Sequence, residues 1–282
     1  MRKRVLVWSL SALLTLGVTA ACGGSSSPTQ SATNNFPLIS SGTLTVATWG
    51  TSPPEIVVNG DQLTGLDGAL LNAFASDHKL TLKVFSTDFA SSILAVQQRK
   101  ADMGAYFYWS PARSQQMFYT KPIFADTTVV IYKDTFTYTG PDSLKGKKIG
   151  ATTGSVYTPI VQKLFGNNVV VFPGITQMST ALINGQVDAL VEANTVATEP
   201  PLAGRTDIKQ TQVNPGDFGM TADQLTHIAY NVVPCGSGKL ADALDAELAK
   251  LQSSGAWTKA LSDNSAQPVT FANDRPTQGC SG

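Results

Sequence analysis

Few residues of this chain have the types and spacing that enzyme chemistry needs. The two histidines, His78 and His227, are not accompanied by a G-x-S-x-G turn that would expose a nucleophilic serine. No H-E-x-x-H or C-x-x-C spacing occurs, so we expect no metal site. Gly236-Ser237-Gly238-Lys239 is similar to the end of a phosphate-binding loop, but Leu240 follows where Ser or Thr is required. The sequence therefore predicts no catalytic residue, no metal and no cofactor.

The aromatic run Tyr106-Phe107-Tyr108-Trp109 indicates chemistry of another kind, the binding of a small molecule. If this segment is extended, alternation places the two tyrosines on one face and the other two rings on the opposite face. We expect the tyrosines to face a pocket with their hydroxyl groups, and Trp49 to join them there. Such ring faces can hold a cation. The alternative is that Trp49 and Trp109 pack between loops.

A second candidate contact is Thr153-Gly154-Ser155, where a predicted strand ends and a predicted helix begins. Backbone N–H groups and the helix dipole at such a junction favour a bound anion. Ser155 is also a good N-cap residue, and the two roles are compatible.

Composition and charge exclude several classes of protein. The 282 residues include 20 Lys and Arg against 20 Asp and Glu, which argues against a nucleic-acid binder, because such proteins need clustered positive charge. Hydrophobic residues make up 42% of the chain and charged residues 14%, so the chain can bury a sizeable core and most of it is not disordered.

The N-terminus has the pattern of a secretion signal. Basic residues in Met1–Arg4 precede an apolar run, Val5–Ala20, and small residues lead to Cys22. This end resembles a bacterial lipobox, which implies removal of residues 1–21 and lipidation of Cys22, palmitate included. The alternative is a retained anchor helix, but about 16 apolar residues fall short of the ~20 that span a bilayer. Cleavage would leave a mildly acidic domain with 17 basic side chains against 20 acidic ones.

The remaining cysteines form an even pair. With Cys22 lipidated, Cys235 and Cys280 are left in an oxidising compartment, and we predict a disulfide between them. Closing a loop of roughly 45 residues would contribute on the order of 3 to 4 kcal/mol and would fasten the polar tail 262–282 to the body.

Short β-branched runs alternate with helical patterns from Gly42 onwards, after a polar linker that we place at residues 22–41. This alternation predicts an α/β fold with a parallel sheet. The predicted strands are 44–47, 80–85, 148–151, 169–172, 187–191 and 227–233, and the predicted helices are 66–78, 88–99, 155–165, 176–184 and 240–251. Asp88 is the candidate N-cap of the second of these helices.

The alternation restarts after the turn at 138–142, which indicates two similar lobes with a cleft between them. We assign residues 42–132 and 227–282 to lobe 1, residues 139–220 to lobe 2, and segments 133–138 and 221–226 to the hinge crossings.

Several segments, taken together in order and spacing, resemble the polar amino-acid branch of the bacterial extracellular solute-binding proteins that serve ABC importers. The resemblance covers about residues 42–261 and implies a two-lobed periplasmic-binding-protein-like fold. Its segments are Gly42–Val46, Pro53-Pro54, Leu63–Asp67, Ser110–Arg113, Tyr119–Pro122, Leu144–Gly150, Gly154-Ser155 and Asn184–Ala189.

The resemblance implies roles for particular residues. Arg113 would clamp the α-carboxylate of the ligand, which suits the planar fork of a guanidinium. Gly154 and Ser155 would supply the second anion contact. Phe89 would cover the ligand side chain, with ordinary core packing as the alternative.

One departure from the family pattern concerns the ligand's ammonium group. Relatives place an Asp where this chain has Ala193. Glu192 is our candidate for that role if the strand end is bulged, with Glu55 as the second candidate. Without such a partner the ligand would be an acid, an amide or a quaternary amine.

The expected protein is thus a monomeric, lipid-anchored receptor outside the cytoplasmic membrane, on the outer face or the periplasmic side. It would capture a small polar ligand, deliver it to the permease subunits of an ABC importer, and do no chemistry. Two alternatives stay open: an enzyme similar to cyclohexadienyl dehydratases, which share this fold, and a surface lipoprotein without a transport role.

Overall fold

The computed structural model describes residues 34–264, 266 and 274–282. The predicted signal segment 1–21, Cys22 and most of the predicted linker lie outside these residues. None of the helices described is both long and apolar enough to cross a membrane.

The first part of the fold is built on β1 (Thr43–Thr48). It pairs in parallel with β4 (Thr81–Ser86) and with β5 (Met103–Tyr108), and β11 (Thr226–Pro234) runs antiparallel to β5. Four helices accompany these strands: α1 (Gly65–Asp77), α2 (Phe89–Gln97), α6 (Gly238–Ser253) and α7 (Ala256–Asp263).

The second part repeats the strand and helix alternation. Its central strand β7 (Ile149–Thr152) pairs in parallel with β8 (Val169–Phe172) and with β9 (Ala189–Ala193). Helices α4 (Thr158–Phe165) and α5 (Ile175–Ile183) pack on this sheet. The α/β prediction is confirmed, and every strand and helix that the alternation predicted is present, with ends shifted by at most three residues. The sheet is mixed rather than parallel, since β11 runs antiparallel to β5.

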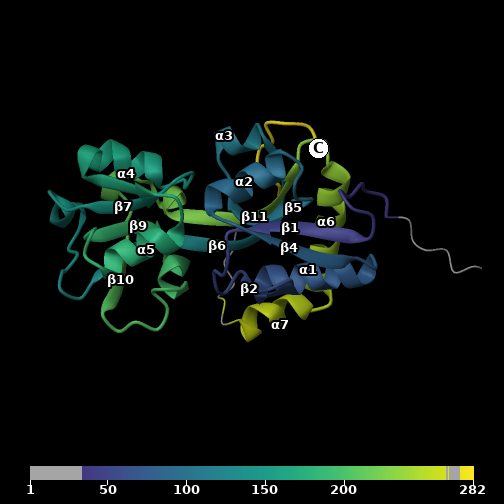
Figure 1. Cartoon of the computed structure of the whole chain (residues 1–282), viewed down its shortest axis with the longest axis horizontal. Coiled ribbons are helices and arrows are strands. Elements are labelled where there is room, and N and C mark those ends of the chain that lie inside the picture. Colours follow the sequence, from purple (N-terminus) through teal and green to yellow (C-terminus); the bar gives the residue numbers. More distant parts are fainter. Residues whose placement is uncertain (1–33, 265, 267–273) are drawn as a thin grey trace, which may run out of the picture. The chain divides into compact units, whose positions relative to one another are not determined.

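One long strand, β6 (Met117–Lys133), joins the two parts. Its first portion pairs with β11, and from Thr128 onwards it pairs with β9 and with β10 (Ile208–Gln212). The resulting sheet has the order β4-β1-β5-β11-β6-β9-β7-β8, with β10 on β6, and Figure 1 shows β6 and β11 at its centre. The change of partner falls at Thr127–Thr128, ahead of the segment assigned to the first hinge crossing, and the lobe boundaries stay a prediction.

Smaller elements complete the chain. They are the hairpin β2 (Val57–Asn59) and β3 (Gln62–Thr64), the helix α3 (Pro111–Ser114), and the 3-10 helices η1 (Pro141–Leu144), η2 (Gly166–Asn168), η3 (Asn194–Thr198), η4 (Asp217–Gly219) and η5 (Ala222–Leu225).

Packed structure begins earlier than the predicted linker boundary. Phe36 is buried in the core cluster that contains Leu44 and Phe74, and its ring stacks on Phe74 with 5.5 Å between the centroids. The prediction that residues up to 41 form a linker is therefore wrong for this stretch. Burial of the apolar ring of Phe36 stabilises a packed chain here, whereas a solvated linker would leave the ring in water.

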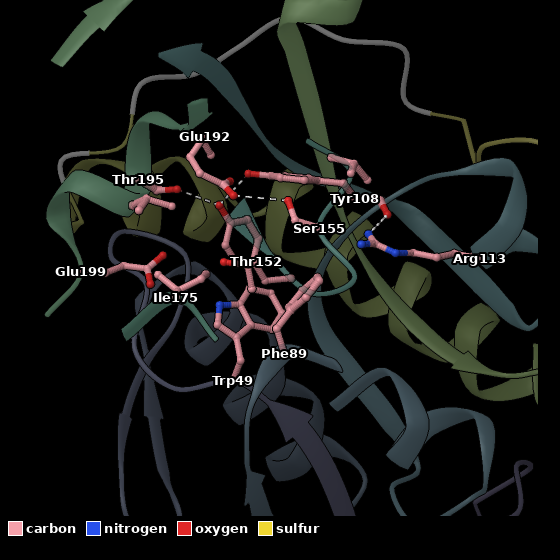
Figure 2. Close-up of a pocket in the computed structure, with 14 residues that line it drawn as sticks. Trp49, Phe89, Tyr108, Arg113, Thr152, Ser155, Ile175, Glu192, Thr195 and Glu199 are labelled. Atoms are coloured by element: carbon pink, nitrogen blue, oxygen red, sulfur yellow. Dashed lines mark hydrogen bonds between the residues drawn. The ribbon is translucent and has the colours of Figure 1, made fainter. Parts of the chain in front are cut away.

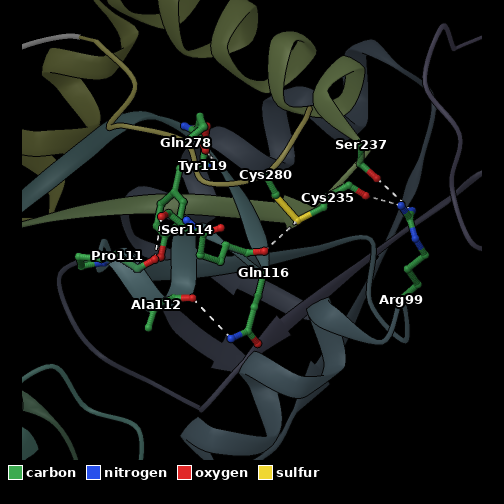
Figure 3. The surroundings of a disulfide bond; sticks show 11 residues. Arg99, Pro111, Ala112, Ser114, Gln116, Tyr119, Cys235, Ser237, Gln278 and Cys280 are labelled. Atoms are coloured by element: carbon green, nitrogen blue, oxygen red, sulfur yellow. Dashed lines mark hydrogen bonds between the residues drawn. A yellow bond between two sulfur atoms is a disulfide. The ribbon is translucent and has the colours of Figure 1, made fainter.

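The disulfide between Cys235 and Cys280 is confirmed, with 5.9 Å between the Cα atoms. Figure 3 shows the tail that it holds. The side chain of Gln278 accepts a hydrogen bond from Tyr119 N and donates to Tyr119 O, and Gly279 N donates to Ser114 O in α3. The C-terminal segment thus braces α3, the short helix that carries Arg113.

Candidate functional site

A pocket lies between side chains of the first part and side chains of the second (Figure 2). Its empty volume is about 450 Å³, part of it open to solvent, which is within the usual range for small-molecule sites. The residues that line it are Trp49, Phe89, Tyr106, Tyr108, Arg113, Thr152, Ser155, Val156, Ile175, Glu192, Ala193, Thr195, Val196 and Glu199.

Aromatic rings from the first part form one wall. Trp49 stacks on Tyr106 with 5.2 Å between centroids, and Phe89 meets Trp49 edge-on at 4.9 Å. Phe107 is buried in the core behind them. The alternation along β5 therefore places Tyr106 and Tyr108 on the pocket side, as expected, while ligand contact by these rings stays a prediction.

The other aromatic residue of the run points elsewhere. Trp109 does not line the pocket, and its Nε1 donates to Thr277 O in the C-terminal segment. For Trp109, packing between loops is thus the correct alternative, whereas Trp49 lines the pocket.

The two tyrosines share one carboxylate. Tyr106 OH and Tyr108 OH each donate to Asp126 Oδ2 at 2.5 Å, and Tyr106 OH also lies 2.9 Å from Thr195 Oγ1. Burial raises the pKa of Asp126 to about 6 in spite of these donors. Tyr106 has φ 61°, a left-handed conformation that costs a bulky residue energy, and these hydrogen bonds help to hold it there.

Sequence reasoning missed Asp126, which lies on the strand β6 that was not predicted.

Glu55 lies behind this network and does not line the pocket. Its side chain is buried, and burial followed by the charge of Asp126 raises its pKa well above the ordinary value. The structure therefore brings Glu55 close to Asp126 rather than to the pocket wall, which argues against it as the second candidate for the ammonium partner.

Arg113 is a buried guanidinium whose terminal nitrogens both donate to backbone oxygens. Nη1 donates to Tyr108 O at 2.7 Å and Nη2 to Gly154 O at 2.5 Å, so the side chain links β5 to the turn after β7. Its Cζ lies 5.2 Å from the centre of the Phe89 ring. Burial lowers the pKa of Arg113 from its ordinary value. Gly154 takes part through this carbonyl and does not line the pocket.

Ser155 lines the pocket but does not cap a helix. Helix α4 begins at Thr158 with Tyr157 as its N-cap, three residues later than predicted, because Ser155 N and Tyr157 N are already bonded within a turn. Ser155 N donates to Thr152 O at 3.0 Å, and Tyr157 N donates to Ser155 Oγ at 3.2 Å. The predicted anion-binding helix start is thus wrong in its geometry.

Glu192 reaches the pocket from β9 without a bulge. Its register with Val129 is regular, so the bulge that sequence reasoning required is absent from this part of the described sheet. Glu192 is 5% exposed and its Oε1 accepts a hydrogen bond from Ser155 Oγ at 3.3 Å. Burial raises the pKa of Glu192 to about 8.

Glu199, at the end of η3, is a second pocket carboxylate that sequence reasoning missed. It is 4% exposed, and its Oε1 accepts a 2.6 Å hydrogen bond from Ser52 Oγ, a residue of the first part of the fold. Burial, with the nearby charge of Glu192 as a smaller cause, raises its pKa to about 8. The scarcity of glutamate was the available signal, since the chain has only Glu55, Glu192, Glu199 and Glu247.

The two histidines lie outside the pocket. His78 caps the C-terminus of α1 and His227 lies near the start of β11, where burial lowers its pKa to about 4. Among the described residues, no group of three or more His, Cys, Asp or Glu side chains is arranged to hold a metal ion.

Comparison with known proteins gives consistent matches. Residues 44–264 match the bacterial extracellular solute-binding proteins, family 3. A putative ABC transporter arginine-binding protein 2 of Escherichia coli (strain K12) is 27% identical over 160 residues, which are 56% of this chain and 65% of that protein. The chain thus spans just under two thirds of that relative's length.

Solved structures show the same fold. The substrate-binding protein of an amino acid ABC transporter has a TM-score of 0.70 at 22% identity, covering 79% of this chain and 99% of that one. An amino acid ABC transporter substrate-binding protein from Streptococcus pneumoniae, solved with L-arginine, has a TM-score of 0.65 at 25% identity, covering 79% of this chain and 94% of that one.

Proposed function

Because this chain belongs to the bacterial extracellular solute-binding proteins of family 3, it has a substrate-binding role, and we propose that its pocket captures a small polar ligand for delivery to an ABC importer. The ligand class that we propose is an amino acid or a related amine or carboxylate. The relatives described above support this class, since they include substrate-binding proteins of amino acid ABC transporters.

The observation that carries the proposal is the origin of the pocket walls. Trp49 and Tyr106 come from the first part of the fold, whereas Ser155, Glu192 and Glu199 come from the second. Cavities between two lobes are common small-molecule sites, because a ligand there can contact both at once.

Polar contacts already join the two walls around the pocket. Ser52 Oγ donates to Glu199, Arg113 donates to Gly154 O, and Tyr106 OH pairs with Thr195. A ligand that adds contacts to both walls would favour the closed arrangement over an open one. The closed form would then be the one that the permease subunits recognise.

The proposal includes the expectations about location. Signal cleavage would leave a monomer tethered by lipid at Cys22, outside the cytoplasmic membrane. Export is in keeping with the disulfide between Cys235 and Cys280, since such bonds persist in oxidising compartments.

One observation favours the dehydratase-like alternative. Glu192 and Glu199, with pKa values of about 8, hold protons at neutral pH and so could act as a general acid on a leaving hydroxyl. Incubation with prephenate or arogenate, followed by product analysis, tests this reading. Product formation that is lost in Glu192→Gln would establish it.

A binding screen tests the main proposal. Thermal unfolding is measured with amino acids, amines and betaines, and a true ligand at 100 times its Kd should add about 2.7 kcal/mol to the free energy of unfolding. Trp49→Ala should weaken that ligand, because it removes a pocket ring. Phe85→Ala, on an exposed ring of β4, is the matched control and should leave the affinity unchanged. If no compound shifts the unfolding transition, the chain is better explained as a surface lipoprotein without a transport role.

A further inference from the structure

Asp126 is a buried carboxyl group of β6 that does not line the pocket but is bonded to its aromatic wall. It is 1% exposed, and its Oδ2 accepts hydrogen bonds from Tyr106 OH and Tyr108 OH, both at 2.5 Å. The next residue, Thr127, donates from its backbone nitrogen to Asn194 Oδ1 at 2.9 Å, at the point where β6 changes partners. Asp126 therefore lies where β5, β6 and η3 meet.

Asp126 and Glu55 are neighbouring buried carboxyl groups, and only one of them has hydrogen-bond donors. Neither side-chain oxygen of Glu55 has a partner among the described residues, whereas Asp126 has the two tyrosine hydroxyls. Donors favour the charged form of a carboxyl group, and a like charge beside it disfavours a second ionisation. Burial and the charge of Asp126 accordingly raise the pKa of Glu55 well above its usual value, while that of Asp126 rises only to about 6. At neutral pH, Asp126 is therefore the ionised member of the pair.

The ionised carboxylate sets the direction of both tyrosine hydroxyls. Burial, followed by the charge of Asp126, raises the pKa of Tyr106 and of Tyr108 well above the ordinary value, so both keep their protons. A carboxylate can only accept, and O–H···O⁻ distances of 2.5 Å are typical of such charge-assisted bonds. The two tyrosine oxygens lie 2.9 Å apart because both are bonded to the same atom. Neither hydroxyl has a proton left to donate to the pocket.

Each tyrosine oxygen still has lone pairs that can accept a hydrogen bond. That of Tyr106 lies 2.9 Å from Thr195 Oγ1, and Thr195 is the donor of this bond, since the Tyr106 proton is directed at Asp126. The oxygen of Tyr108 has no hydrogen bond beyond Tyr106 and Asp126 among the described residues. Because Tyr108 lines the pocket (Figure 2), its hydroxyl offers a ligand an acceptor and not a donor.

We propose that Asp126 is a positioning residue that sets the specificity of the site, because it makes the Tyr108 hydroxyl an acceptor that a ligand can meet only with an N–H or O–H group. The inference rests on the proposed function, in that the pocket must bind a solute. It applies equally to ligands with and without a carboxylate. Asp126 acts through Tyr108 and does not itself touch the ligand.

Ultraviolet resonance Raman spectra of the ligand-free protein test the orientation of the hydroxyls. The intensity ratio of the tyrosine Fermi doublet distinguishes hydroxyls that donate strong hydrogen bonds from those that accept them. Asp126→Ala removes the shared acceptor, so its spectrum should lose strong-donor character relative to the wild type. Asp102→Ala is the matched control, because Asp102 is a buried carboxylate that accepts from the backbone nitrogens of Ile39 and Thr45, and its ratio should equal that of the wild type.

A double-mutant cycle tests the route from Asp126 to the ligand. The probe is the compound that gives the largest thermal shift in the panel of amino acids, amines and betaines, and its affinity is measured by isothermal titration calorimetry. Asp126→Ala should weaken its binding by at least about tenfold, because the donor of the ligand loses an acceptor held in place by a charge. Tyr108→Phe should weaken it by a similar factor. Adding Asp126→Ala to Tyr108→Phe should cost much less, since no hydroxyl is left to orient. Asp102→Ala should bind as the wild type does.

Two results overturn this inference and leave the proposed function in place. One is an unchanged Raman ratio in Asp126→Ala, and the other is a loss of affinity of equal size with and without Tyr108→Phe. Circular dichroism establishes that each variant folds. If Asp126→Ala does not fold, the difference spectrum between the wild type and Tyr108→Phe must show Tyr108 as a strong donor, and otherwise the inference fails.

Failure of the proposed function gives a different result. If no compound of the panel binds, that function is overturned. The Raman comparison, which uses no ligand, still decides whether Asp126 orients the hydroxyls.

Discussion

At the scale of single residues, Arg113 shows how a position implied by family resemblance acquires a second role. The resemblance implies a clamp on a ligand carboxylate, and the structure places the guanidinium between two backbone oxygens, Tyr108 O and Gly154 O. Arg113 therefore ties strand β5 to the turn after β7. A side chain that bridges two walls of a pocket contributes to the stability of the fold as well as to the binding of any ligand.

Replacing Arg113 should consequently destabilise the protein even without ligand. Arg113→Ala removes two charge-assisted hydrogen bonds to backbone oxygens, of which only Tyr108 O keeps another donor, Tyr119 OH. We expect the free energy of unfolding to fall by about 2 to 4 kcal/mol in urea titrations. Arg205→Ala removes an exposed pair with Asp207 and should leave the midpoint nearly unchanged. An unchanged midpoint for Arg113→Ala, together with a lost ligand, would instead favour the carboxylate clamp.

At the scale of elements, the start of helix α2 matters because its first residue is Phe89, a pocket ring. Asp88 Oδ1 accepts from Ser91 N at 2.9 Å and Oδ2 accepts from Ser91 Oγ at 2.6 Å, so the predicted N-cap is confirmed. These donors hold the pKa of Asp88 below its usual value.

Asp88→Ala should remove this cap and lower the free energy of unfolding by about 1 kcal/mol. Asp88→Asn keeps an acceptor at the same place and should lose far less. Thermal unfolding of the two variants beside the wild type makes the comparison, and equal losses for Ala and Asn would contradict the capping role.

The C-terminal segment acts on another element, α3. The disulfide between Cys235 and Cys280 closes a separation of 45 residues and holds the segment that bonds to Ser114 and Tyr119. The tail therefore supports the backbone on which Arg113 is mounted.

Replacing both cysteines by serine should lower the free energy of unfolding by about 3 to 4 kcal/mol in the chain-entropy description. Urea titration of the double variant, with and without a reducing agent, gives the measurement. The reducing agent should lower the midpoint of the wild type and leave that of the variant unchanged, and equal midpoints for oxidised and reduced wild type would contradict the bracing role.

At the scale of the whole molecule, stability should depend on pH through the buried pocket acids. Glu192 and Glu199 have folded-state pKa values of about 8 against an ordinary value of 4.5, so the folded protein binds more protons than the unfolded chain between these values. Their contribution to the free energy of unfolding is fully present below about pH 4.5 and is lost as the pH rises through about 8. His227, whose pKa is lowered to about 4, acts in the opposite sense only below its ordinary value of 6.5.

The free energy of unfolding of the ligand-free protein should therefore fall between pH 6.5 and pH 8.5. In urea titrations over this range, the double variant Glu192→Gln/Glu199→Gln should show a much shallower fall in the free energy of unfolding. Asp67 is responsible for part of the remaining fall, because burial raises its pKa to about 7. Parallel curves for the variant and the wild type would show that these glutamates are ionised in the ligand-free protein.

Local pattern predicted the short β-branched strands β1, β7 and β9, although they are buried along nearly their whole length, because turn residues and helical patterns bound them. It missed the much longer β6, which is buried along nearly its whole length and lacks a clear alternation. Helix α7 was missed for the opposite reason, since its eight residues bury only Trp257 and Ala260.

The sequence by itself determined the α/β class, the disulfide, the cap at Asp88 and the placement of the two tyrosines on one face, whereas the structure put that face at the pocket. These features depend on periodicity, on parity of cysteines or on bonds between residues three positions apart. Only the tertiary structure decided which distant groups meet: Ser52 with Glu199, the tyrosines with Asp126, and Arg113 with Gly154. The physical reason is that such contacts, and the burial that shifts the pKa values of the acids, depend on how β6 and β11 bring the two parts of the fold together.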